Sequence, residues 1–129
     1  MATINRKNRN FTDINMLFGS HPVTADIIKR SDEDAVKASI RNLILTKNYE
    51  RPFHPEIGCQ MHSLPFELWD PVLRNVIQRT IKDTLDKFEP RAKINRVEIS
   101  DKSDTNEIDV TVEFMMQNTN TPITVTTTL

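Results

Sequence analysis

The stretch EIDVTVEFMM, residues 107–116, decides the fold class of this chain. Apolar side chains at every second position alternate with acidic residues and threonine, which is the period of a strand with one buried face. This alternation is the clearest strand signal in the chain. We therefore expect a half-buried strand here, in a sheet whose other face meets solvent.

Weaker strand patterns lie on both sides of this stretch. Before it, residues 92–100 alternate apolar and charged side chains, and the polar run 101–106 predicts a hairpin loop. After it, residues 117–120 predict a turn and residues 121–129 a final strand. One face of that strand is expected to carry the threonines, and the other face Ile123, Val125 and Leu129.

Two amphipathic segments precede these strands. Ser31 offers a cap for a helix over residues 32–47, with acidic residues in its first turn. Asp70 offers a cap for a longer helix with Pro71 at its first position, which ends at the residue before Pro90. A wide stripe at helical spacing along this second helix is expected in the core: Trp69, Val72, Leu73, Val76, Ile77, Thr80, Ile81, Thr84, Leu85 and Phe88.

Together these elements predict an α+β fold with two main helices packed on a small, mainly antiparallel sheet. Residues 23–29 read as a further short strand, so the expected order is strand, helix, helix and three strands. Residues 1–20 read as an N-terminal arm, either a frayed terminus or a segment that becomes ordered on a partner. Residues 21–129 are expected to form a single domain.

Composition excludes several classes of function. The chain has 129 residues, 17 basic and 18 acidic, so its formal net charge of -1 favours neither nucleic acid nor a membrane as a partner. No apolar run approaches the roughly 20 residues of a membrane span, and the N-terminus lacks the apolar stretch of a secretory signal. The only glycines, Gly19 and Gly58, stand apart, which excludes a glycine-rich phosphate loop. The single cysteine, Cys59, fits a reducing compartment.

Three kinds of chemistry can be read into the middle of the chain, each weakly. A metal site would use His54, Cys59 and His62, but these three ligands have no second cluster to complete a tetrahedral site. A nucleophilic Cys59 lacks a local signature. Acid–base catalysis would pair two of four carboxyl groups, those of Glu56, Glu67, Asp70 and Glu89. We expect no catalytic residue, no metal and no cofactor.

Two stretches carry more specific patterns. Residues 50–59, ERPFHPEIGC, combine two rigid prolines, a guanidinium group and a glycine able to adopt positive φ. Residues 88–91, FEPR, place a carboxylate and a guanidinium at the corner between the second helix and the next strand. Taken alone, these stretches are either a loop anchor and a helix stop or a recognition surface.

At these two stretches the sequence resembles the baseplate wedge proteins, or sheath initiators, of contractile phage tails, which have a counterpart in type VI secretion systems. The resemblance runs from about residue 23 to residue 129. It includes SDEDAV at 31–36 and SIRNLILT at 39–46, which leads into the ERPFHPEIGC stretch. The Glu-Pro-Arg signature of the family appears as residues 89–91, directly after the long helix.

The resemblance implies a structural protein of the virion, although members were at times labelled lysozymes. It implies a place in the tail baseplate, assembled in the host cytoplasm, where the wedge meets the central hub and tube in six copies or a multiple of six. The implied partners are other wedge proteins, tube or hub proteins, and the sheath protein, whose first ring such proteins are thought to template by strand exchange or addition. The implied interface residues are Glu89, Pro90, Arg91, Arg51, Pro52, Phe53 and Gly58.

The last strand offers a mechanism for strand docking. It has high β propensity and no interior glycine, and Pro122 lies only at its start. Such an unprotected edge can pair with an extended arm through main-chain hydrogen bonds. The docking edge is expected over Thr124, Val125, Thr126, Thr127 and Thr128.

Two questions stay open at this point. Glu89 and Arg91 either contact neighbouring subunits or pair with each other or with the Arg51 loop. The chain as a whole is expected to be a baseplate subunit that nucleates sheath polymerisation. The alternative is a lysozyme-like, peptidoglycan-cleaving hydrolase that uses the carboxylates around the loop.

Overall fold

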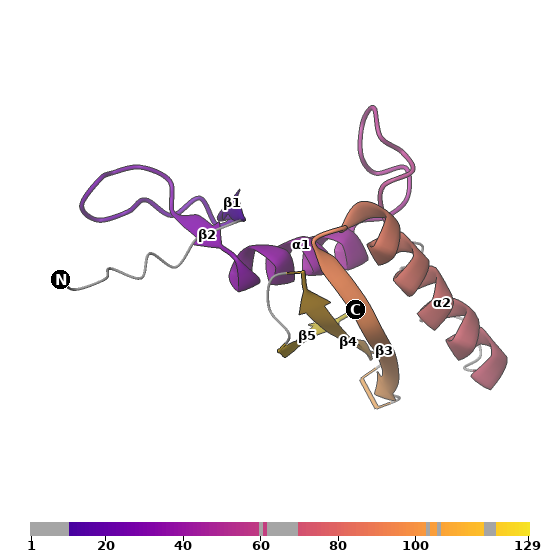
Figure 1. Cartoon of the computed structure of the whole chain (residues 1–129). Coiled ribbons are helices and arrows are strands. Elements are labelled where there is room, and N and C mark those ends of the chain that lie inside the picture. Colours follow the sequence, from indigo (N-terminus) through magenta and orange to yellow (C-terminus); the bar gives the residue numbers. More distant parts are fainter. Residues whose placement is uncertain (1–10, 60, 62–69, 103, 106, 118–120) are drawn as a thin grey trace. The chain divides into compact units, whose positions relative to one another are not determined.

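A computed structural model describes residues 11–59, 61, 70–102, 104–105, 107–117 and 121–129. The chain divides into two compact units, residues 1–37 and 38–129. Its elements are, in chain order, β1 (Thr12–Ile14), β2 (Lys29–Ser31), α1 (Glu33–Leu45), α2 (Pro71–Phe88), β3 (Ala92–Lys102), β4 (Glu107–Met116) and β5 (Pro122–Thr128) (Figure 1). The predicted α+β fold is confirmed, with one more strand near the N-terminus than expected. The proposed boundary between an arm and a domain at residues 20 and 21 stays a prediction.

The second unit is built on a three-stranded antiparallel sheet in the order β3–β4–β5. The alternation in β4 does what its sequence predicts, because Ile108, Val110 and Val112 are buried whereas the residues between them are partly exposed. Val112 lies opposite Val97 in β3 and Val125 in β5, so the apolar side chains of all three strands share one face.

The long helix α2 begins and ends where the sequence predicts. The Asp70 side chain accepts a hydrogen bond from the backbone N–H of Val72 at 3.1 Å, and Pro71 occupies the first helical turn. Glu89, with φ -125° and ψ 71°, has left the helical region before Pro90. Both ends are therefore set by local chemistry.

The expected wide apolar stripe of α2 is wrong in its extent. Only Ile77, Ile81 and Leu85 are fully buried, whereas Val72 is 66% and Val76 56% exposed. Because these three buried residues are spaced by four, they form a single narrow row, and α2 lies beside β3. Trp69, also expected in the stripe, lies outside the described residues.

Helix α1 begins at Glu33 and not at the predicted cap, Ser31. Ser31 pairs with Thr12 as the last residue of β2, and the carbonyl of Asp32 (φ 50°) accepts the first helical hydrogen bond from Val36. The helix ends at Leu45, two residues before the predicted end. Its fully buried apolar side chains are Ala35, Val36, Ile40, Leu43 and Ile44.

In the first unit the strand expected over residues 23–29 is displaced toward its C-terminal end. Turns occupy residues 22–24, where His21 Nδ1 accepts hydrogen bonds from the backbone N–H groups of Val23 and Thr24 at 3.3 and 3.4 Å. Ala25 follows with a φ of 54°, which an extended strand cannot contain. Apart from an isolated bridge between Ile27 and Ser20, pairing therefore starts at β2, which lies antiparallel to β1.

Candidate functional site

The Glu-Pro-Arg signature forms a buried ion pair within the chain. Glu89 is 2% exposed, and both of its carboxylate oxygens accept hydrogen bonds from Arg91: Nε to Oε1 at 2.5 Å and Nη2 to Oε2 at 2.8 Å. Burial raises the pKa of Glu89, but the hydrogen bonds from Arg91 and from Ser39 on α1 outweigh burial and lower the pKa below its usual 4.5. Glu89 is thus held as a carboxylate.

Backbone contacts fasten the same corner to the end of β4. The side-chain amide of Gln117 donates to the carbonyl oxygen of Pro90 at 2.9 Å, and the backbone N–H of Gln117 donates to the carbonyl of Arg91 at 3.4 Å. The N–H of Glu89 closes the last turn of α2 on Leu85 at 2.8 Å. Of the two readings left open by the sequence, the structure supports a pair that holds the helix-to-strand corner together.

The ERPFHPEIGC stretch, except for its last residue Cys59, lies in a loop, residues 47–58, that projects from the second unit; we call it the Phe53 loop (Figure 1). The N–H of Tyr49 donates to the carbonyl of Pro55 at 2.9 Å across the loop, and the N–H of Lys47 donates to the carboxylate of Glu50 at 2.9 Å. At the base, a Cβ on Gly58 (φ 143°) would lie 2.7 Å from the carbonyl oxygen of Thr46. Only glycine fits this buried position, so Gly58 anchors the loop, and the interface role that the resemblance implies for it stays a prediction.

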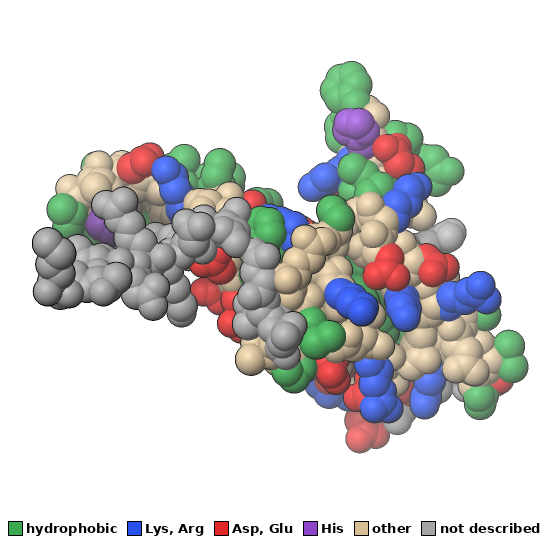
Figure 2. Space-filling model, in the orientation of Figure 1, with side chains coloured by type: hydrophobic (Ala, Val, Ile, Leu, Met, Phe, Trp, Pro, Cys, Tyr) green, Lys and Arg blue, Asp and Glu red, His purple; other side chains and the backbone are tan. Residues whose placement is uncertain are grey.

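The outer end of the Phe53 loop presents large side chains to solvent. Phe53 is 97% and Tyr49 85% exposed, and Arg51 and Pro52 are exposed as well. Figure 2 shows hydrophobic side chains, a histidine and charged groups gathered on this projection. Arg51 forms no ion pair within the described part of the chain, so the structure does not join it to Glu89 and Arg91.

The predicted docking edge lies in β5, with one correction to its faces. Thr124, Thr126 and Thr128 are exposed as expected, but Thr127 is only 2% exposed. A strand has a period of two, so Thr127 falls on the same inner face as Ile123 and Val125. The Thr127 hydroxyl is buried, and it has no hydrogen-bond partner among the described residues.

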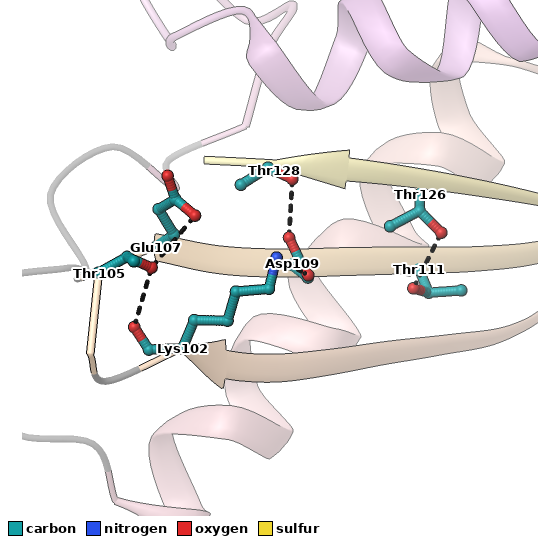
Figure 3. Close-up of polar contacts among 7 residues, drawn as sticks. All are labelled: Lys102, Thr105, Glu107, Asp109, Thr111, Thr126 and Thr128. Atoms are coloured by element: carbon teal, nitrogen blue, oxygen red, sulfur yellow. Dashed lines mark hydrogen bonds and ion pairs between the residues drawn. The ribbon is translucent and has the colours of Figure 1, made fainter.

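Polar contacts that the sequence reading missed hold β5 against the hairpin (Figure 3). The Asp109 carboxylate in β4 forms an ion pair with the ammonium group of Lys102 at 2.7 Å and accepts a hydrogen bond from the hydroxyl of Thr128 at 2.7 Å. The hydrogen bonds from Lys102 and Thr128 lower the pKa of Asp109, and the same carboxylate raises the pKa of Lys102. The sequence does contain a signal for this ion pair, because Lys102 and Asp109 have opposite charges and lie near the two ends of the predicted hairpin loop.

The two outer strands of the sheet differ in how open they are to pairing. β3 lies beside α2, contains an irregularity between Ile94 and Arg96, and exposes charged side chains such as the Arg96–Glu98 ion pair at 2.7 Å. All of these features discourage edge pairing. β5 has no charged residue, and β4 is its only partner in the described sheet. In the described sheet β5 is therefore the less protected edge, and its use for docking stays a prediction.

Among the residues considered for catalysis and metal binding, those in the described part of the chain occupy separate local contacts. The His54 ring contacts Glu56 at 3.2 Å in the exposed loop, Cys59 is buried, and Asp70 caps α2. His62 and Glu67 lie outside the described residues. In the part of the chain that the structure covers, no three histidine, cysteine or acidic residues could share a metal ion.

Three carboxyl groups have a pKa shifted in the direction opposite to that of a general acid. The pKa is lowered for Glu89, for Asp109 and for Glu56, where a backbone hydrogen bond and one from His54 are the main causes. A general acid in a glycosidase needs a raised pKa.

Over the described segments, no helix has the length and apolar character to cross a membrane.

The described structure is that of a small α+β protein with three notable features. These are the outer edge of β5, the projecting Phe53 loop, and the helix-to-strand corner held by Glu89 and Arg91. The family profile of baseplate wedge protein gp25 matches residues 30–121, and the chain belongs to this family of structural proteins of contractile-tail baseplates. The resemblance noted from the sequence is confirmed.

Individual relatives agree with this membership. Baseplate wedge protein gp25 of Enterobacteria phage T4 is 33% identical over 57 residues, which cover 44% of this chain. The match spans 43% of that relative, less than half of its length.

Solved structures support the fold. A Geobacter sulfurreducens protein that carries a tail-lysozyme label has a TM-score of 0.71 at 24% identity, over 79% of this chain and 93% of that chain. A chain in the six-fold symmetrised baseplate of the anti-feeding prophage has a TM-score of 0.65 at 22% identity, over 92% of this chain and 83% of that chain.

Proposed function

We propose that this chain is a structural baseplate subunit that links the wedge to the central hub or tube and templates the first ring of the tail sheath. The observation that carries the proposal is the open edge of β5. An extended arm of the sheath protein would add to this edge as a fourth strand. The chain would act in the virion, after assembly in the host cytoplasm, and its partners would be sheath, tube or hub and other wedge proteins.

Ladder geometry indicates which groups an arriving strand would meet. The backbone N–H groups of Ile108 and Leu129 each donate to the carbonyl of the other, at 3.1 and 2.9 Å. Because hydrogen-bonded pairs alternate along an antiparallel ladder, residues 123, 125 and 127 face β4 with their backbone groups. The backbone groups of Thr124, Thr126 and Thr128 then point outward and are available to a new strand.

Polar contacts support this edge without occupying it. Thr128 binds Asp109 and Thr126 lies 3.3 Å from Thr111, both through side chains on the exposed face of the sheet (Figure 3). These contacts fix the register of β5 against β4 and leave the outward backbone groups unpaired in the described sheet. A preformed edge of this kind lowers the ordering cost of docking.

The copy number follows from the expected setting. A subunit at the junction of wedge and hub would be present in six copies or a multiple, in keeping with the six-fold symmetrised baseplate that contains a similar fold. We propose no enzymatic activity, no cofactor and no nucleic-acid or membrane partner. Incubation of the purified protein with peptidoglycan should therefore release no fragments at acidic or neutral pH.

A proline at an outward-facing position tests strand docking. Thr126→Pro removes one outward N–H group but no hydrogen bond of the β4–β5 ladder, so the fold should persist. Tails carrying this variant should show baseplates with tubes but without sheath in electron micrographs. Thr126→Val is the matched control, because it loses the same side-chain hydroxyl and keeps the N–H group; it should give full-length sheaths.

Normal sheath growth on Thr126→Pro baseplates would overturn the docking mechanism. Thr124→Pro is a second variant at an equivalent outward-facing position. It replaces Thr126→Pro if that variant has a lowered melting temperature. Circular dichroism should show that the variant used keeps its secondary structure.

A further inference from the structure

The Phe53 loop carries an aromatic side chain in a position that folding does not explain. Phe53 is 97% exposed, and Tyr49 on the same loop is 85% exposed. A phenylalanine ring left in water forgoes the free energy of burying a large apolar surface. Neither ring contributes to the core of this chain, so the tip has apolar surface to offer to another molecule.

The loop holds this ring in a strained, prearranged conformation. Phe53 and Tyr49 have φ values of 71° and 68°, a region that bulky side chains rarely adopt. The Tyr49–Pro55 hydrogen bond at 2.9 Å and the tight seat of Gly58 hold the backbone around these residues. Strain of this kind persists only where the surrounding structure enforces it, and it gathers at binding sites.

The charges of the loop leave two cations, the ammonium group of Lys47 and the guanidinium group of Arg51, without an ion pair among the described residues. The Glu50 carboxylate accepts the N–H of Lys47 at 2.9 Å, and the Glu56 carboxylate contacts His54 at 3.2 Å. Arg51 is exposed and has no such contact within the described residues. The tip therefore combines an aromatic ring with an available guanidinium group, the residue types enriched in interface hot spots.

We propose that the Phe53 loop is a docking anchor that inserts Phe53 into an apolar pocket of a neighbouring tail protein, where Arg51 meets a carboxylate at the rim of the pocket. This inference rests on the proposed function, which makes the neighbour another baseplate protein. A protein partner fits better than nucleic acid, because two available cations give little phosphate affinity and the chain has net charge -1.

The first test measures incorporation into tails. Phe53→Ser and Arg51→Glu should each reduce the copies of this chain in purified tails by roughly tenfold or more, measured by quantitative mass spectrometry. Val72→Ser is the matched control, since Val72 is an exposed apolar residue of α2 outside the loop, and its copy number should change by less than about twofold. Melting temperatures of the free variants should match that of the wild type, because these side chains lie outside the core.

The second test identifies the partner directly. A benzophenone amino acid at position 53 in assembled tails should crosslink to one tail protein other than this chain, in a peptide that combines apolar residues with Asp or Glu. A crosslink to a second copy of this chain, a crosslink to DNA, or no crosslink in tails that contain the labelled chain would each overturn the inference.

The two proposals fail separately. Purified Phe53→Ser should still nucleate polymerisation of purified sheath protein, whereas Thr126→Pro should enter baseplates normally and fail to carry sheath. If Phe53→Ser enters tails as well as the wild type does, the anchor is refuted and the baseplate role stands. If the wild-type chain is absent from tails, the proposed function itself is refuted.

Discussion

Glu89 and Arg91 would leave different defects behind if either were removed. Glu89 is 2% exposed and cannot reach water, whereas the Arg91 side chain is 24% exposed. Arg91→Met should therefore reduce the free energy of unfolding by about 3 kcal/mol, because it leaves a buried carboxylate without its counter-charge. Glu89→Gln should cost less, about 1–2 kcal/mol, because the guanidinium can still be solvated. Urea denaturation at neutral pH measures both, and equal losses would contradict this account.

The same pair predicts the direction of a pH effect. The pKa of Glu89 in the folded protein lies below 4.5, so its stabilising contribution is present above that pH and is lost as pH falls through the folded-state pKa. The difference in stability between the wild type and Glu89→Gln should shrink as the pH falls below 4.5. A difference that stays constant down to pH 2 would show that Glu89 does not act through its charge.

Thr127 predicts a stabilising substitution. Its hydroxyl is buried without a partner among the described residues, and valine has nearly the same shape. Thr127→Val should raise the free energy of unfolding by roughly 1 kcal/mol, because a buried, unsatisfied hydroxyl costs about that much. Thr126→Val, on the exposed face, should change it by less than about 0.5 kcal/mol. Destabilisation by Thr127→Val would mean that the hydroxyl is satisfied after all.

At the scale of the elements, the sequence predicted what local chemistry decides. The alternation of β4 needs only neighbouring residues, and so do the Asp70 cap and the stop at Pro90; all three are confirmed. The buried state of Thr127 was also within reach, since a period of two pairs it with Val125. The sequence prediction placed all threonines of this strand on the exposed face because threonine is polar, whereas their positions in the strand decide which face they share.

Other elements depend on contacts that no local pattern contains. Val72 and Val76 have helical spacing but are exposed, because α2 buries a single row of side chains. Ser31 has the chemistry of a helix cap but pairs in β2 with a residue 19 positions earlier. In the candidate site, the Glu89–Arg91 contact was one of two readings from spacing, but the hydrogen bond from Ser39 was not foreseeable.

At the scale of the molecule, the two units should differ in their share of the stability. No described residue from 11 to 31 is fully buried, and several apolar ones are well exposed, such as Leu17 at 80% and Phe18 at 68%. A chain shortened to residues 32–129 should therefore lose less than about 1 kcal/mol of unfolding free energy, because none of the described side chains that it removes is buried. Urea denaturation of both chains measures the difference, and loss of a cooperative transition in the shorter one would contradict this assignment.

The unequal edges of the sheet also set how many copies can associate through it. A molecule with one edge able to pair has a valency of one: two copies can join β5 to β5 and then stop. A molecule with two such edges could extend without limit into a fibre. The charged, irregular β3 beside α2 should therefore limit association through this three-stranded sheet to two copies of the free protein. In a tail, strand addition to this sheet would therefore start at the outer edge of β5 and proceed in one direction only.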